Sequence, residues 1–126
     1  PPLPSPEGRP LKRQRAGFFQ VDYTMHAENR ARVVERLRAD ALTPKRAVLL
    51  LQGGASEERH DSDHELIFRQ ESSFHYLFGV KEPDCFGSID VGSGETTLYI
   101  PRLKPEYAVW MGKIQQPGWF AELYGV

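Results

Sequence analysis

The stretch FRQESSFHYLFGV, residues 68–80, carries most of what this sequence indicates about its fold. Its aromatic side chains surround a compact polar block and one histidine; they are Phe68, Phe74, Tyr76 and Phe78. Polar groups left unpaired among the rings would cost about 1–3 kcal/mol each, so we expect Arg69, Glu71 and His75 to form a bonded network. Taken alone, the stretch is consistent with a catalytic site, a binding surface or a core segment.

The overall composition is that of one globular domain. The chain has 126 residues, 40% of them hydrophobic and 26% charged, with a formal net charge of −1. This balance gives no electrostatic reason to expect a nucleic-acid partner, and no apolar run approaches the roughly 18 residues that a membrane span requires. Cys85 is the single cysteine, which excludes an internal disulfide and fits a reducing compartment. We therefore expect a cytoplasmic protein, with no secretory signal in its proline-rich first residues.

The first 17 residues differ in composition from the rest. They hold five of the ten prolines and the basic run LKRQR. Such a segment cannot bury enough apolar surface to fold, so we predict a disordered tail over residues 1–17 and a folded domain over residues 18–126. Contact between the basic run and an acidic partner is the alternative to a solvated tail.

Two segments predict a helix and a buried strand. Thr24 suits the N-cap of the helix, and Pro44 ends it. Apolar residues recur at helical spacing on one stripe, while the arginines, Arg30 among them, fall on the other faces; the stripe is Ala27, Ala31, Val34, Leu37 and Ala41. Residues 47–54, AVLLLQGG, are a continuous apolar run that suits a strand buried in the middle of an α/β sheet.

The second half of the chain predicts a hairpin and two short helices. The strands CFGSIDV and TTLYIPR flank GSGE, a typical glycine-bearing hairpin turn. Thr97 and Tyr99 share one face of the second strand, and Leu98 lies on the other. Pro105 and Pro117 suit the first turns of the helices PEYAVWMGKI and PGWFAELYG. This order of elements indicates the α/β class, with a mixed sheet flanked by helices.

Residues 59–65, RHDSDHE, are the strongest candidate for a metal site in the sequence. Imidazole and carboxylate groups are suitable ligands for zinc, manganese or iron. One polar loop rarely supplies convergent ligands and a supporting shell, so we expect a solvated loop in which Asp63 bonds local backbone amides. A serine pair near His75 argues only weakly for a catalytic triad, and Cys85 suits a small buried hydrophobe.

Several motifs from residue 62 onward resemble a known family. The segments SDHELIFRQESSFHYLFGVKEPDCFGSIDV, TTLYIPR and VWMGK are similar to the N-terminal domain of Xaa-Pro peptidases, the prolidase and aminopeptidase P group of creatinase-like metallopeptidases. The shared signature is Phe68-Arg69-Gln70, Ser72, Phe74, Tyr76, Gly79 and Glu82-Pro83. The resemblance covers roughly residues 30–124 and implies a single domain of the creatinase/prolidase N-terminal type.

The resemblance also implies which functions lie outside this chain. Enzymes of this family hold two metal ions, usually manganese, on Asp, His and Glu ligands of a C-terminal domain, and hydrolyse the peptide bond before proline. We assign none of those ligands here, and so expect neither a catalytic residue nor a metal site in this chain. The implied role is a non-catalytic domain that shapes the substrate cleft and supports a homodimer. Its partners would be an Xaa-Pro peptide and its own C-terminal domain.

The resemblance makes Trp110 the residue expected nearest to function. The matching tryptophan of dimeric members reaches the partner subunit's active site, so we expect an at least partly exposed ring in this chain alone; a core tryptophan is the alternative. Asp63, Arg69 and His75 are the candidates for cleft or dimer contacts in the preceding segment. Two other functions stay open: a stand-alone creatinase-like module that binds a peptide or protein, and a creatinase-like hydrolase that is not a peptidase.

Overall fold

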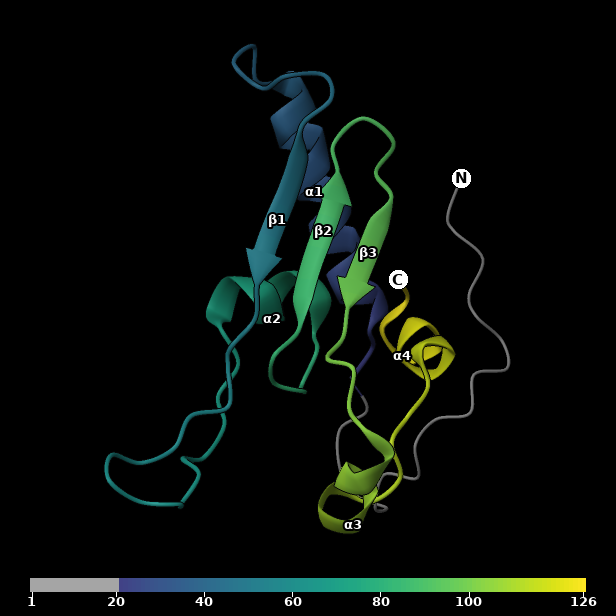
Figure 1. Ribbon diagram of the computed structural model, residues 1–126. Helices are drawn as coiled ribbons and strands as arrows, with labels where there is room; N and C mark the ends of the chain where they lie inside the picture. The colour runs from purple at the N-terminus through teal and green to yellow at the C-terminus, as the bar shows by residue number, and fades with distance from the viewer. Residues whose placement is uncertain (1–20) are drawn as a thin grey trace.

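The computed structural model describes residues 21–126, and the predicted disordered tail lies outside the described residues. The elements, shown in Figure 1, are α1 (Thr24–Ala39), β1 (Val48–Gln52), α2 (Ser72–Phe78), β2 (Phe86–Asp90), β3 (Thr96–Tyr99), the 3-10 turn η1 (Pro105–Tyr107), α3 (Ala108–Met111) and α4 (Pro117–Tyr124). Both short helices predicted at the prolines are present. In residues 21–126 no helix has the length and apolar character needed to cross a membrane.

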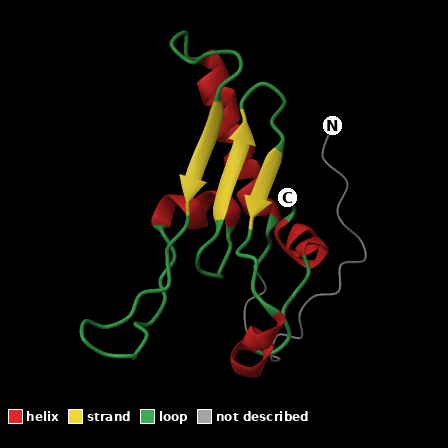
Figure 2. Ribbon diagram, viewed as in Figure 1, coloured by secondary structure: helices red, strands yellow, loops and turns green. Residues whose placement is uncertain are grey.

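The three strands form one sheet in the order β1-β2-β3. Its register aligns Leu50 of β1 with Ser88 of β2, and Ser88 with Thr97 of β3. In Figure 2, α1 and α2 lie behind this sheet, so the architecture is a helical layer on one face of a sheet. The predicted α/β class is confirmed, and both strand pairs among the described residues are antiparallel.

The β2–β3 hairpin closes through the predicted turn. Asp90 Oδ1 accepts hydrogen bonds from the Ser93 backbone N–H at 2.6 Å and from the Ser93 hydroxyl at 3.0 Å. These two bonds, the backbone bond first, lower the pKa of the Asp90 carboxyl. Gly94 has φ 81°, a conformation that residues with a Cβ rarely adopt. Thr97 and Tyr99 share one face of β3, as predicted, and the structure shows that both are exposed.

Helix α1 forms in the predicted segment but ends at Ala39, before Pro44, and buries a partly different face. The residues that it buries are His26, Asn29, Arg30 and Val34. In the predicted stripe Val34 is buried and Leu37 is half-buried, whereas the alanines at 27, 31 and 41 are exposed, so the prediction is wrong for the alanines. The solvated position expected for Arg30 is also wrong, because this side chain is 5% exposed. The reason is that polar side chains on this face find backbone partners in α2, so their burial leaves no polar atom unpaired.

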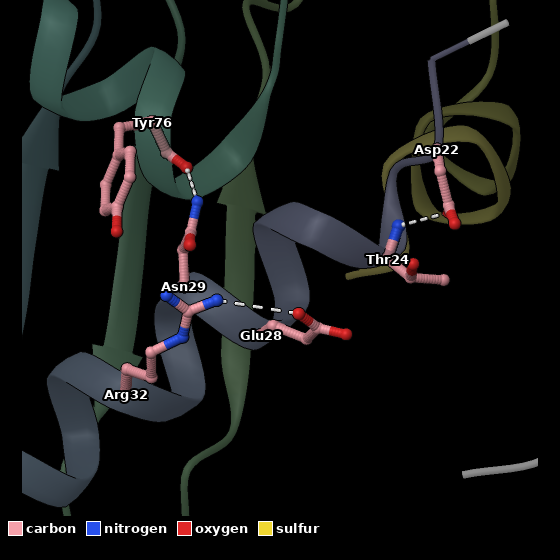
Figure 3. Close-up of polar contacts among 6 residues, drawn as sticks. All are labelled: Asp22, Thr24, Glu28, Asn29, Arg32 and Tyr76. Atoms are coloured by element: carbon pink, nitrogen blue, oxygen red, sulfur yellow. Dashed lines mark hydrogen bonds and ion pairs between the residues drawn. The ribbon is translucent and has the colours of Figure 1, made fainter. Parts of the chain in front are cut away.

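The start of α1 differs from the prediction as well. The N-cap residue is Tyr23 and not Thr24, and it makes no side-chain capping bond. Instead the Thr24 backbone N–H donates to Asp22 Oδ1 at 2.9 Å, as Figure 3 shows. One turn later Arg32 and Glu28 form an exposed ion pair at 3.5 Å. Exposed ion pairs contribute only about 0–1 kcal/mol to the free energy of folding. The position of α1 therefore depends mainly on its packing against α2.

The buried face of α1 binds the carboxyl end of α2. Asn29 Nδ2 donates to the Tyr76 carbonyl oxygen at 3.0 Å (Figure 3), and His26 Nδ1 lies 2.9 Å from the same oxygen. Arg30 Nη1 donates to the Leu77 carbonyl at 2.8 Å. Carbonyls in the last turn of a helix have no intrahelical partner, so these side chains satisfy groups that would otherwise be buried unpaired. Burial lowers the pKa of Arg30 from its ordinary value.

The hydrophobic core lies between the sheet and the helices. Phe74 and Phe78 stack with ring centroids 4.9 Å apart, and the Arg30 guanidinium carbon lies 5.6 Å from the Phe78 ring centroid. A Cβ at Gly87 of β2 would collide with the Phe78 ring, which explains the glycine in mid-strand. Tyr76, by contrast, is exposed. The buried cluster comprises Val34, Phe74, Leu77, Phe78, Val80, Cys85, Ile89 and Tyr124.

Strand β1 lies at an edge of the sheet, so its predicted place in the middle is wrong for the described residues. Within residues 21–126 it pairs with β2 alone. Its side chains alternate: Leu49 and Leu51 pack against the core, while Val48, Leu50 and Gln52 are exposed. The run is apolar on both faces, yet in residues 21–126 the helical layer covers only one of them.

Candidate functional site

Residues 72–78 of the aromatic stretch form helix α2, an element that the sequence analysis did not predict. Glu71 caps it: its carboxylate accepts hydrogen bonds from the Ser73 N–H at 3.0 Å and the Phe74 N–H at 2.7 Å. These backbone bonds, the Ser73 bond first, lower the pKa of Glu71. Gly79 ends the helix at φ 66°, and a Cβ there would also collide with the His26 ring. The cap and the glycine fix both ends of α2.

The Gln70 side chain, two residues before α2, forms hydrogen bonds with three separate backbone segments. Its Oε1 accepts from the Gly54 N–H at 2.5 Å and from the Glu71 N–H at 3.0 Å. Its Nε2 donates to the carbonyls of Val80 at 3.2 Å and Glu82 at 3.1 Å. One amide side chain therefore joins the end of β1, the start of α2 and the connection to β2.

The predicted network of Arg69, Glu71 and His75 is wrong. The Glu71 carboxylate caps α2, whereas Arg69 and His75 are exposed. The His75 ring lies edge-on to the His26 ring, with centroids 6.0 Å apart. Exposed polar groups are hydrated, so they need no internal partner. Arg69 and His75 are therefore accessible to a ligand or a second protein, while the catalytic-triad interpretation gains no support.

Residues 57–66 form a narrow exposed loop. Glu58 and Glu65 form an antiparallel bridge. The Ser62 hydroxyl accepts from the His64 N–H at 3.2 Å, so Ser62 and not Asp63 makes the local backbone bond that we predicted. Asp63 itself is exposed. Among the described residues, no three His, Cys, Asp or Glu side chains are grouped so that they could hold a metal ion, and the donors of this loop do not fit a metal centre.

The segment around Trp110 projects its apolar side chains into solvent. Neither η1 nor α3 contains a buried residue. Trp110 is 85% exposed and Val109 80% exposed, and Tyr107 and Met111 are exposed beside them. This exposure contradicts a core position for Trp110. The apolar tip, as we call Tyr107, Val109, Trp110 and Met111, has no packing role within the described chain.

The structure does not bring the four predicted site residues into contact. Figure 1 shows that the loop between β1 and α2 and helix α3 both extend beyond the same end of the sheet. Asp63 and Arg69 belong to this loop, His75 to α2, and Trp110 to α3. No hydrogen bond, ion pair or ring contact joins any two of them within residues 21–126. They share one end of the molecule without forming a closed site.

A cavity of about 540 Å³ lies elsewhere, between α1 and the β2–β3 turn. Arg30, Glu35 and Arg38 line it from α1. Arg38 Nε donates to the Val91 carbonyl at 2.7 Å and Nη2 to the Gly92 carbonyl at 2.8 Å, so its guanidinium holds the hairpin. Both arginines that line the cavity are thus engaged by backbone carbonyl oxygens.

Residues 26–126 match the family described as "Aminopeptidase P, N-terminal domain". The chain belongs to this family. It is 45% identical over 108 residues to the Xaa-Pro dipeptidase of Homo sapiens and 46% identical over 108 residues to that of Mus musculus. Each alignment covers 86% of this chain but only 22% of the dipeptidase. The resemblance inferred from the FRQ-to-EP motifs is confirmed.

Solved structures agree on the fold. Aminopeptidase PepP of Pseudomonas aeruginosa superposes with a TM-score of 0.70 at 22% identity, over 86% of this chain and 24% of that one. The low-pH form of aminopeptidase P from E. coli gives a TM-score of 0.69 at 19% identity, over 86% and 24% of the two chains. This chain thus spans about a quarter of the length of these two solved chains.

Proposed function

We propose that this chain is the non-catalytic N-terminal domain of a cytoplasmic, metal-dependent Xaa-Pro peptidase. Its membership of the aminopeptidase P N-terminal family supports the proposal, as does its 45% identity to an Xaa-Pro dipeptidase. The chain spans 22% of that relative, which leaves room for a separate catalytic domain. In the proposed enzyme, a C-terminal domain holds two metal ions, usually manganese, which activate water for hydrolysis of the bond before proline.

The exposure of Trp110 is the observation that carries the proposed role of this domain. An indole ring buries a large area when it is covered, and here it is 85% exposed on a four-residue helix. A rigid ring with few rotatable bonds can line a substrate pocket with little loss of side-chain conformational entropy. The apolar tip therefore contacts a partner subunit of a homodimer and lines the cleft that receives the Xaa-Pro peptide.

The three polar candidates have complementary roles in this proposal. Arg69, His75 and Asp63 are exposed; Asp63 and Arg69 belong to the segment that leads from β1 into α2, and His75 belongs to α2. The Arg69 guanidinium suits a carboxylate, which it can bind through two hydrogen bonds. His75 and Asp63 supply further polar contacts to substrate or to the partner subunit. None of them acts as a nucleophile or a metal ligand.

The proposal is tested by comparing this chain with the longer polypeptide that contains it. Both are incubated with manganese and with an Xaa-Pro dipeptide or a longer Xaa-Pro peptide, and free amino acids are measured. We expect hydrolysis by the longer polypeptide only, and none of a matched Xaa-Ala peptide. Hydrolysis by the 126-residue chain itself would contradict the non-catalytic assignment. A longer polypeptide that binds these peptides without cleaving them would instead identify a binding module.

A further inference from the structure

The apolar tip includes an exposed methionine. The sequence has two methionines, Met25 and Met111. Met25 lies on α1 and is 48% exposed, whereas Met111 is the last residue of α3 and is 59% exposed. Methionine is more often buried, because its flexible apolar side chain fills gaps in cores. Both side chains are thus open to solvent, and one chain supplies two methionines of similar exposure for comparison.

The surroundings of the two methionines differ. The residues three and four positions after Met25, its neighbours on the helix surface, are both polar. Met111 instead follows Trp110, which is 85% exposed, and no residue of α3 is buried. A Cβ added at Gly112 would have no heavy atom within 4 Å apart from its chain neighbours, so space is open at this end of α3. Figure 1 shows α3 beyond the end of the sheet, where a small oxidant can reach it.

Hydrogen peroxide can oxidise an exposed methionine by transfer of one oxygen atom. The Met111 sulfur attacks one peroxide oxygen, so an S–O bond forms as the O–O bond breaks. The departing hydroxide takes the proton of the transferred oxygen and leaves as water. The sulfur loses two electrons, and the peroxide gains them. The product, methionine sulfoxide, places a polar acceptor oxygen on a surface that was apolar.

We propose that Met111 is a reversible oxidation site that controls whether the apolar tip binds the partner subunit. This inference rests on the proposed function, in which the tip contacts a second copy of the chain. The thioether permits this contact, and the sulfoxide prevents it. Methionine sulfoxide reductases, one for each sulfoxide epimer, reverse the oxidation. The site thus couples assembly of the homodimer to the concentration of peroxide around the free subunit.

The sulfoxide opposes association because its oxygen would be buried among apolar side chains. Val109 of the tip carries no side-chain hydrogen-bond donor, and the Trp110 ring presents a single N–H. A buried acceptor without a donor weakens an association by about tenfold or more. Oxidation of the free subunit therefore shifts the equilibrium toward the monomer. Loss of the partner removes Trp110 from the cleft that it lines, so hydrolysis falls together with the dimer.

Cys85 does not compete for the oxidant within this chain. It is the single cysteine of the sequence and is 0% exposed. Peroxide oxidises cysteines that are ionised and accessible to solvent, and burial opposes both conditions. We therefore expect the methionines of this chain to be oxidised before its cysteine.

The decisive variant is Met111→Leu, with Met25→Leu as its matched control. Leucine keeps the apolar character of methionine but has no sulfur to oxidise. Each longer polypeptide is treated with hydrogen peroxide, its oxidised residues are located by mass spectrometry, and its dimer dissociation constant is measured by sedimentation. Relative to the untreated sample of each protein, we expect this constant to rise about tenfold or more in the wild type and in Met25→Leu. Met111→Leu should be insensitive to peroxide, and the two reductases should restore the wild type.

Two results of this experiment would overturn the proposal. One is an equal rise of the dissociation constant in the wild type and in Met111→Leu. The other is an unchanged constant in wild-type protein that carries the Met111 sulfoxide.

The oxidation rate of the wild-type protein gives a second test that does not depend on a variant folding. Because the partner subunit covers the tip, Met111 should be oxidised more slowly at protein concentrations above the dissociation constant than below it. Met25, which lies outside the tip, should be oxidised at the same rate at both concentrations. A rate for Met111 that does not depend on protein concentration would overturn the proposal.

A parallel assay of Xaa-Pro hydrolysis separates this proposal from the proposed function. If the longer polypeptide hydrolyses the peptide while oxidation of Met111 leaves its dimer intact, the oxidation site is wrong and the function stands. If it does not hydrolyse the peptide while that oxidation dissociates the dimer, the oxidation site stands and the function is wrong.

Discussion

The Tyr124 hydroxyl donates a hydrogen bond of 2.5 Å to Glu82 Oε2. Tyr124 is the last residue of α4, and Glu82 lies in the connection between α2 and β2. The tyrosine ring is 1% exposed, and burial first, then this bond, raise the pKa of Tyr124 above its ordinary value. The hydroxyl therefore stays protonated and remains a donor. This contact attaches the last helix of the described chain to the segment that carries the Glu82-Pro83 motif.

Replacing Tyr124 with phenylalanine should destabilise the protein by about 1–3 kcal/mol, because Glu82 loses a buried hydrogen-bond donor. Urea unfolding of the 126-residue chain measures the change. Tyr107→Phe is the control, since Tyr107 is half exposed on η1 and no hydrogen bond joins its hydroxyl to another residue within 21–126. Equal stabilities for the two variants would show that the short contact contributes nothing.

Substituting Gln70 with glutamate tests the link between β1, α2 and β2. A glutamate carboxylate could still accept from the amides of Gly54 and Glu71, but it could not donate to the carbonyls of Val80 and Glu82. We expect a loss of about 2–4 kcal/mol in urea unfolding, since two donor bonds are replaced by repulsion. Gln52→Glu, on the exposed face of β1, makes the same chemical change and should be nearly neutral in this chain. A neutral Gln70→Glu would contradict the linking role.

The parts of the fold that the sequence predicted are those set by local backbone chemistry. The GSGE turn requires a glycine at positive φ, and proline favours the first turn of a helix at Pro105 and Pro117; all three features are present. Helix α2 was predictable in principle, because Phe74, Leu77 and Phe78 have helical spacing. The aromatic residues Phe74, Tyr76 and Phe78 stand at every second position, which is the spacing of a strand, and this obscured the helical pattern.

The wrong predictions from the sequence concern residues whose burial depends on contacts with distant parts of the chain. Arg30 is buried because the carbonyls of Leu77 and Gly125 accept its hydrogen bonds. These acceptors lie 47 and 95 residues away in the sequence, so no local pattern indicates them. Leu50 is exposed because nothing among the described residues covers its face of the sheet. The exposure of Trp110 followed from the family resemblance alone, since helical spacing does not distinguish a surface tryptophan from a core one.

The cap of α2 predicts a pH-dependent effect of Glu71→Gln. Since the pKa of Glu71 is lowered in the folded state, its contribution to stability is present above the unfolded value of about 4.3 and is lost as pH falls through the folded value. We expect the variant to lower the thermal midpoint by a few degrees at pH 7, and this difference from the wild type to shrink as the pH falls below about 4.3. Glu122→Gln, an exposed change on α4, should show no such pH dependence. A difference that does not shrink as the pH falls would contradict the capping role of Glu71.

Cys85 should react slowly with thiol reagents in the folded protein. It is 0% exposed, and burial first, then the nearby carboxylates of Glu82 and Asp84, raise its pKa to about 11. At pH 8 only about 0.1% of the thiol would be ionised. We expect iodoacetamide labelling, followed by mass spectrometry, to be at least tenfold slower in buffer than in denaturing urea. Equal labelling rates would show that the β2 end of the core opens readily.

The role of Trp110 is tested by the kinetics of Trp110→Ala in the longer polypeptide. Leu42→Ala is the control, because Leu42 is 89% exposed like Trp110 but lies between α1 and β1, outside the apolar tip. If Trp110 only contacts the bound substrate, its loss raises KM. If the ring also orients the substrate for reaction, its loss lowers kcat as well. Metal content and oligomeric state are measured for each variant, so that a change in either is not taken for a loss of substrate contact.

The most direct test of the account is therefore kcat/KM for an Xaa-Pro peptide in these variants. We predict that Trp110→Ala lowers it by about tenfold or more, which corresponds to about 1.4 kcal/mol, while metal content stays at the wild-type level and Leu42→Ala stays close to wild type. A Trp110→Ala enzyme with wild-type kcat/KM would contradict the claim that this domain shapes the substrate cleft.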